Sequence, residues 1–217
     1  MRAPSRVTEQ ANNGELELTL ELLNAVHNDS NLTQRSLASD LGIALGLANA
    51  YLKRCVKKGL VKVKQVPSNR FAYYLTPQGF AEKSRLTAEY LTQSFNFFRV
   101  ARQQCAGMFA ECNEKNLNRI ALWGLGDLAE IATLCATEYP VTLVGVVAQG
   151  STETSFHNIP IVSDPSTLTD VDAIVLTDFS NPQKSYAAAL ALWPRERVFA
   201  PRLLNVDDPS QWPQEEI

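Results

Sequence analysis

The sequence predicts an α+β module of three helices and a two-stranded hairpin, joined by a long helix to an α/β module with a parallel sheet. Apolar residues recur at helical spacing near the N-terminus, no proline follows Pro77 until well beyond Glu114, and short apolar runs alternate with helical segments after Arg119. We therefore expect domains at residues 15–76 and 119–204, a connecting helix at residues 77–116, and a C-terminal tail at residues 205–217.

Composition restricts the class of protein before any motif is considered. The 217 residues are 45% hydrophobic and 20% charged, which is typical of a soluble globular chain and excludes disordered and collagen-like classes. Neither a membrane-spanning apolar run nor a signal-peptide core is evident, so we expect a cytoplasmic protein without membrane partners. The four cysteines form no CxxC pair, and we expect them to be reduced packing residues that hold no metal.

Charge is distributed very unevenly along the chain. Residues 1–119 carry 16 Lys and Arg against 10 Asp and Glu, whereas residues 120–217 carry 4 against 13. Tyr51 to Arg70 alone holds seven cations and no acid. This asymmetry predicts two modules with different partners, of which the basic one faces a polyanion.

The basic module has the element order of a winged helix-turn-helix. A helix is expected over Leu16–Val26, a second helix begins after the N-cap Thr33 and ends near Gly42, and a third covers Ala44–Lys58. Two strands follow, over Leu60–Val66 and Arg70–Leu75, and Thr76-Pro77 begins the next helix.

This module resembles the MarR-type winged-helix regulators, and within them the subgroup associated with exopolysaccharide gene clusters. The resemblance covers about residues 15–95. The residues that carry it are Asn31 to Ala38, Leu41 to Ile43, Gly46, Leu52-Lys53, Lys58 to Val61 and Leu75 to Gly79.

The resemblance implies that the third helix enters the major groove of DNA and that the hairpin tip touches the flanking backbone. Leu45, Gly46 and Asn49 would then lie nearest the bases, with Asn49 as the best candidate to bond adenine. The backbone contacts would come from Lys53, Lys57, Lys62, Lys64, Ser68, Asn69 and Arg70. Leu47 and Ala50 depart from the polar or larger residues expected there, so we expect base-specific hydrogen bonds to be sparse.

The connecting helix carries a stripe of apolar residues at heptad-like spacing, broken at Arg102. Its members are Leu91, Phe95, Phe98, Cys105, Phe109 and Cys112. Such a stripe must pack against the second domain or against a second copy of the chain. We favour the second copy and predict a homodimer, because regulators of this kind read two half-sites.

The acidic module has the pattern of a Rossmann-like domain. Strands are expected over Arg119–Trp123, Val141–Val147, Ile159–Val162, Asp172–Thr177 and Arg197–Ala200, which gives a parallel sheet of about four or five strands. A GxGxxA motif, formed by Gly124, Gly126 and Ala129, stands between the first strand and a helix.

This module resembles the Rossmann domains of Rex-type redox repressors and the small domains of nucleotide-sugar-modifying enzymes. The shared residues are Gly124 to Ala129, Asn158 to Ile161 and Phe199 to Pro201. The motif and the strand ends predict that a nucleotide-type ligand would meet Gly124, Gly126, Asp127, Leu128 and Asp178. NAD is disfavoured, because Ala148-Gln149-Gly150 supplies no acid for the adenosine ribose and Asp127 would repel a pyrophosphate. A tight turn that binds no ligand is the alternative.

Taken together, the sequence predicts a DNA-binding transcriptional regulator that binds double-stranded DNA and senses a nucleotide or metabolite, with polysaccharide-synthesis genes as targets by resemblance alone. The alternatives are a Rex-like NAD(H) redox sensor, a nucleotide-sugar-related enzyme, or an interaction protein with a vestigial Rossmann fold. We expect no enzyme and name no catalytic residue, because neither His27 nor His157 has an identifiable partner and no nucleophile stands beside a base.

Overall fold

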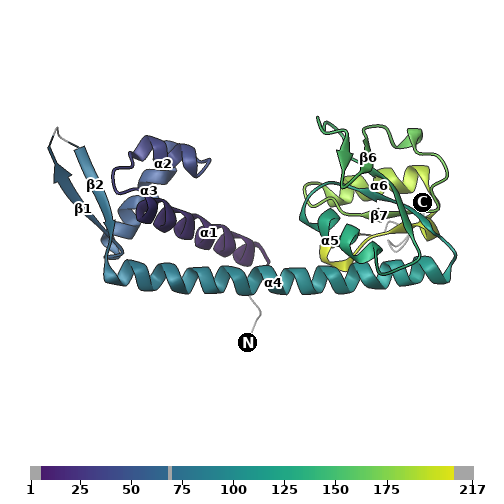
Figure 1. Cartoon of the computed structure of the whole chain (residues 1–217), viewed down its shortest axis with the longest axis horizontal. Coiled ribbons are helices and arrows are strands. Elements are labelled where there is room, and N and C mark those ends of the chain that lie inside the picture. The colour runs from purple at the N-terminus through teal and green to yellow at the C-terminus, as the bar shows by residue number, and fades with distance from the viewer. Residues whose placement is uncertain (1–5, 68–69, 208–217) are drawn as a thin grey trace, which may run out of the picture. The chain divides into compact units, whose positions relative to one another are not determined.

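The computed structural model describes residues 6–67 and 70–207 of the chain (Figure 1). The chain divides into two compact units, Met1–Phe95 and Asn96–Ile217. Among the residues described, no helix combines the length and hydrophobicity that a membrane span requires.

The first unit begins with three helices, α1 (Arg6–Asn28), α2 (Gln34–Asp40) and α3 (Leu45–Lys57). α1 begins ten residues before the predicted start, and α2 is shorter than predicted at seven residues. The predicted N-cap Thr33 is confirmed. Its hydroxyl accepts a hydrogen bond from the Ser36 amide at 3.0 Å, and the Ser36 hydroxyl accepts one from the Thr33 amide at 3.0 Å.

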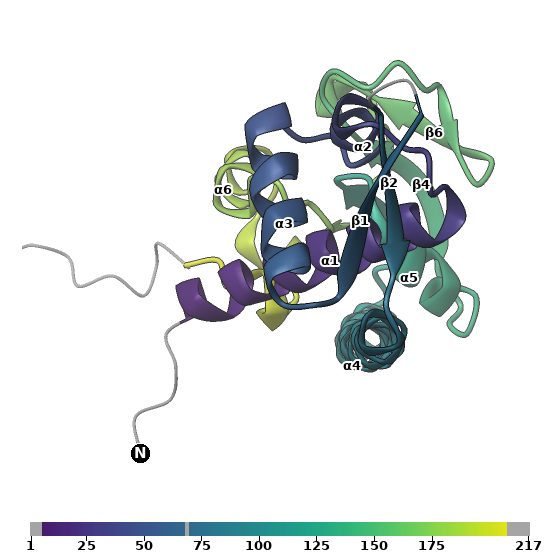
Figure 2. The same cartoon turned by 90° about the vertical axis from the view of Figure 1, so that its left-hand side faces the viewer.

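An antiparallel hairpin follows, formed by β1 (Val61–Val66) and β2 (Arg70–Leu75). It lies beside α3, as Figure 2 shows. The Tyr73 amide donates to the Ser30 carbonyl at 2.9 Å and so ties β2 to the loop before α2. The core of the unit includes the fully buried Leu22, Leu23 and Leu37. This arrangement is the predicted winged helix-turn-helix.

α4 (Pro77–Glu114) is a single helix of 38 residues that leaves the first unit and enters the second. Cys105, Phe109 and Cys112 are fully buried in the core of the second unit. Leu91, Phe95 and Phe98 are exposed to 46%, 59% and 38%. The predicted stripe therefore consists of two parts, and the preference for a second copy is wrong for the C-terminal part, which packs within its own chain.

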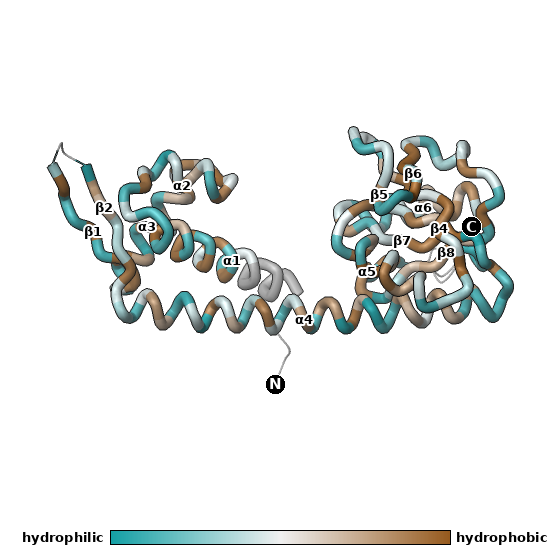
Figure 3. Tube along the Cα trace, in the orientation of Figure 1, coloured by the Kyte–Doolittle hydropathy of each residue, from teal (hydrophilic) through white to brown (hydrophobic). Residues whose placement is uncertain are grey.

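The second unit is a six-stranded sheet in the order β5-β6-β4-β3-β7-β8. Its strands are β3 (Arg119–Trp123), β4 (Thr142–Val147), β5 (Ser155–Phe156), β6 (Ile159–Val162), β7 (Ala173–Leu176) and β8 (Val198–Phe199). β7 is buried throughout, and the strands of this unit are largely hydrophobic in Figure 3. α5 (Asp127–Ala136) packs on β4, and α6 (Pro182–Leu192) packs on β7 and β8.

One edge of this sheet differs from the prediction. β5 pairs antiparallel with β6, whereas the other pairs are parallel, and no strand was predicted before Ile159 at this edge. His157 and Asn158 have φ of 48° and 64°, so the chain turns back within two residues, as in a type I′ hairpin. The predicted α/β Rossmann-like class is confirmed, with one added antiparallel edge strand.

All four cysteines are buried and free, in agreement with the packing role expected for them. Cys55 lies in the first unit, and Cys105, Cys112 and Cys135 lie in the second. Burial raises the pKa of the Cys105 and Cys112 thiols to about 12, so these thiols stay protonated at neutral pH.

Candidate nucleic-acid interface and ligand cleft

The outer surface of α3 is the first candidate site. Ala48, Leu52 and Cys55 recur at helical spacing and are buried, so the opposite face of the helix meets solvent. The predicted contact residues Leu45, Gly46, Lys53 and Lys57 are exposed, together with Leu47 and Ala50. α3 therefore presents apolar residues at its N-terminal turn and cations further along.

Asn49, the predicted base-reading residue, is only half-exposed. Its Oδ1 atom is shielded from solvent and has no hydrogen-bond partner. A base edge could not bond to this oxygen unless the side chain turned outward. The periodicity of α3 indicates which side of the helix Asn49 occupies, but the direction of its carboxamide depends on the packing around it.

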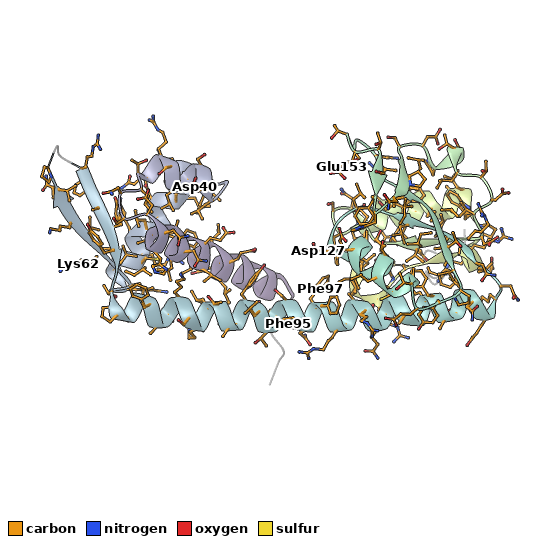
Figure 4. The ribbon with its side chains drawn as sticks, viewed as in Figure 1. Asp40, Lys62, Phe95, Phe97, Asp127 and Glu153 are labelled. Carbon is orange, nitrogen blue, oxygen red and sulfur yellow. The ribbon has the colours of Figure 1, made fainter. Side chains whose placement is uncertain are left out.

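The hairpin sorts its residues onto two faces. Lys62 pairs with Tyr74 and Val66 pairs with Arg70, so Lys62, Lys64 and Arg70 share one face. Figure 4 shows Lys62 on the side of the hairpin turned away from the helices. Val63 and Phe71 belong to the other face. Ser68 and Asn69, predicted to contact the DNA backbone, lie outside the described residues.

A groove of about 350 Å³ separates α3 from that second hairpin face. Its lining consists of Gln34, Leu52, Lys53, Val56, Lys57, Val63, Phe71 and Tyr73. The predicted cations thus form two sets. Lys53 and Lys57 border the groove, whereas the hairpin cations lie on the opposite face. Arg54, a further cation of the same run, forms an ion pair with Glu15 on α1.

The second candidate site is a cleft of about 490 Å³ at the carboxyl ends of β3, β4 and β7. β3 connects through α5 to β4 on one side, while β7 connects through α6 to β8 on the other, so β3 and β7 flank a topological switch point. Open α/β sheets bind ligands in the crevice at such a point. The cleft lies where the sequence predicts a ligand.

Two of the five predicted ligand residues line this cleft, namely Gly124 and Asp178. The Asp178 carboxylate is already bonded within the protein. Oδ1 accepts from the Ser180 and Asn181 amides at 2.8 and 3.3 Å, and Oδ2 accepts from the Ser185 hydroxyl at 2.5 Å. Asp178 therefore holds the start of α6 in place.

The other three predicted residues are not part of the described cleft lining. Gly126 is the N-cap of α5, Asp127 is exposed in its first turn, and Leu128 is fully buried in the core. Leu128 belongs to the apolar face of α5, and this face packs on the sheet. Leu128 is therefore buried in the core and does not face the cleft.

Several lining residues were not predicted as ligand contacts. Those with polar side chains or in the loop after β4 include Gln149, Gly150, Ser151, Ser180, Lys184 and Ser185. Gln149 follows β4, where dinucleotide-binding domains carry an acid. Among the described residues of this lining, Lys184 is the one cation. It belongs to the first turn of α6. The sequence signal for it is its place just after the segment that follows β7.

Both histidines make surface contacts. His157 Nε2 lies 2.5 Å from Glu130 Oε2, and both side chains are about half-exposed. His27 Nδ1 lies 2.7 Å from Lys83 Nζ, and its ring meets that of Phe80 edge-on at 5.0 Å. Neither belongs to the described lining of the cleft.

Comparison with known proteins identifies the first unit. Residues 16–62 match the family described as winged helix-turn-helix DNA-binding, and this match agrees with the fold of the first unit. Among curated proteins, none is detectably similar in sequence.

Three solved structures are similar in backbone structure to parts of this chain. The PcaV transcriptional regulator of Streptomyces coelicolor is 19% identical, with 46% of this chain and 84% of that chain covered and a TM-score of 0.37. A Staphylococcus aureus MepR mutant bound to an oligodeoxyribonucleotide is 18% identical, with 41% and 72% covered and a TM-score of 0.34. The dimethyltransferase RosA of Streptomyces davawensis is 13% identical, with 91% and 82% covered and a TM-score of 0.33.

Proposed function

We propose that this chain is a DNA-binding transcriptional regulator that binds duplex DNA through α3 and the hairpin of its first unit. The observation that carries the proposal is the cationic, acid-free stretch from Tyr51 to Arg70, which lies within and just beyond the segment that matches the winged helix-turn-helix DNA-binding family. Lys53 and Lys57 stand on the exposed side of α3, where a duplex would bring its phosphates.

The test is a salt titration of binding to a random-sequence duplex. Neutralising a phosphate releases a counterion, so the logarithm of the association constant should fall with the logarithm of salt concentration, by about 0.9 per contact. We expect the double variant Lys53→Gln/Lys57→Gln to bind more weakly and to lower the slope by about 2.

A matched control removes two exposed cations of the second unit that lie outside the cleft lining, in the variant Lys115→Gln/Arg197→Gln. We expect this variant to keep the wild-type slope. A wild-type slope near zero, or an equal loss of slope in both double variants, would refute DNA binding through α3.

We further propose that the second unit binds a nucleotide-type ligand in its cleft. The location at the switch point and the single lysine among the described lining residues support this proposal. Gln149 in place of an acid makes NAD a poor candidate. The resemblance to the exopolysaccharide-associated regulators is the one reason to propose polysaccharide-synthesis genes as targets.

The regulator is proposed to act as a homodimer through the exposed part of α4. Leu91, Phe95 and Phe98 follow one another at spacings of four and three and remain exposed in the single chain. A two-fold dimer would present two recognition helices to two half-sites. α4 is continuous between the units, so a ligand that changes the second unit could alter the recognition helices through it.

A further inference from the structure

The N-terminal turn of α3 exposes apolar side chains where a helix in the major groove would meet the bases. Leu45 and Leu47 are each 44% exposed, and Gly46 and Ala50 are exposed as well. None of these side chains has a hydrogen-bond donor or acceptor. The N-terminal residues of a recognition helix are the ones that contact base edges. This turn therefore has no side chain with which to hydrogen-bond a base.

The polar residues next to this turn do not compensate. The Asn49 oxygen is shielded from solvent, and Lys53 borders the groove between α3 and the hairpin, one to two turns further along. An apolar side chain can still distinguish bases, because thymine alone presents a methyl group in the major groove. Covering that methyl with leucine removes apolar surface of both partners from water.

We propose that Leu45 and Leu47 select thymine by packing against its C5-methyl group, so that α3 recognises sequence through apolar contacts. This inference rests on the proposed DNA-binding function. It names the two leucines as specificity-determining residues and predicts thymine at the positions that they face in each half-site. The thymine methyl group would cover these two exposed leucines with another apolar surface.

The test uses selection from a random duplex library, followed by resynthesis of the selected duplex with deoxyuridine in place of individual thymidines. Uracil pairs as thymine does and lacks only the methyl group. We expect the wild-type protein to lose about fourfold in affinity at each thymine that a leucine contacts. The Leu45→Ala and Leu47→Ala variants should each show little or no such loss at the position read by the missing side chain.

The Leu134→Ala variant is the matched control, because Leu134 is a 60% exposed leucine on α5 in the other unit. It should retain the wild-type penalties. Equal wild-type affinity for thymine and uracil duplexes, penalties unchanged in both α3 variants, or no enrichment of any sequence would overturn the inference. If salt-dependent duplex binding persists in those cases, the proposed function stands and only the thymine reading fails; if it is absent, both fail.

Discussion

At the scale of single residues, Gly124 and Gly126 adopt nearly the same backbone angle for different reasons. Their φ values are +114° and +115°, in a region that side chains rarely allow. A Cβ on Gly124 would lie 2.5 Å from the Asp178 backbone, whereas a Cβ on Gly126 would meet no atom within 4 Å. The turn after β3 therefore needs both glycines for its conformation, and Gly124 also for the close approach of Asp178, which follows β7.

Alanine substitutions should separate these two causes. We expect Gly126→Ala to destabilise the second unit by about 2 kcal/mol through backbone strain alone. Gly124→Ala should cost at least about 1 kcal/mol more, because the backbone at Asp178, just after β7, would have to move. Urea unfolding followed by tryptophan fluorescence measures this, since Trp123, Trp193 and Trp212 all belong to residues 96–217. Equal losses in the two variants would contradict the steric role of Gly124.

At the scale of elements, α4 serves two purposes along its length. Its C-terminal part contributes Cys105, Phe109 and Cys112 to the core of the second unit. Arg102, where the stripe is broken, forms an ion pair with Glu138 at 2.6 Å. Phe97 lies two residues after Phe95, on the opposite side of the helix (Figure 4), and packs against Phe179 with ring centroids 5.6 Å apart.

The exposed part of α4 gives a prediction about assembly. We expect the wild-type protein to sediment as a dimer at micromolar concentration and the Phe95→Glu variant to sediment as a monomer, because a charge would be buried in the proposed interface. Asn96→Glu places the same charge on a different face of the helix and should leave the dimer intact. A wild-type monomer, or a dimer unaffected by Phe95→Glu, would contradict the proposal.

At the scale of the whole molecule, a continuous helix joins a basic winged-helix unit to an acidic unit with a cleft. A ligand that binds only the folded second unit raises its stability, by about 2.7 kcal/mol at one hundred times its dissociation constant. Ligand binding to the cleft can therefore be tested by measuring the stability of the protein, without knowledge of the DNA sequence that it binds.

A thermal-shift series with NADH, coenzyme A, a UDP-sugar and S-adenosylmethionine tests the cleft. We expect at least one phosphate-bearing compound to raise the Tm reported by tryptophan fluorescence, and NADH to be the weakest of them. The shift should shrink in Lys184→Gln and persist in Lys184→Arg. Glutamine removes the positive charge that would meet a phosphate in the cleft, whereas arginine keeps it. No shift with any compound, or an equal shift in Lys184→Gln, would argue against a phosphate-bearing ligand in this cleft.

The sequence by itself determined the two modules, their helices and parallel strands, and the capping at Thr33. These features depend on periodicity and on short-range hydrogen bonds, which neighbouring residues specify. The position of the cleft also followed from the sequence, because a glycine-rich turn after a parallel strand marks that edge of the sheet.

Only the tertiary structure decided which residues face one another. Pairing across the hairpin placed Lys62, Lys64 and Arg70 on the face opposite the groove, and packing shielded the oxygen of Asn49. Phe109 is buried in the core of the second unit, whereas Phe95 is exposed, although both belong to one stripe. Burial depends on partners far away in the chain, so a local pattern can show that a residue is apolar without showing what will cover it.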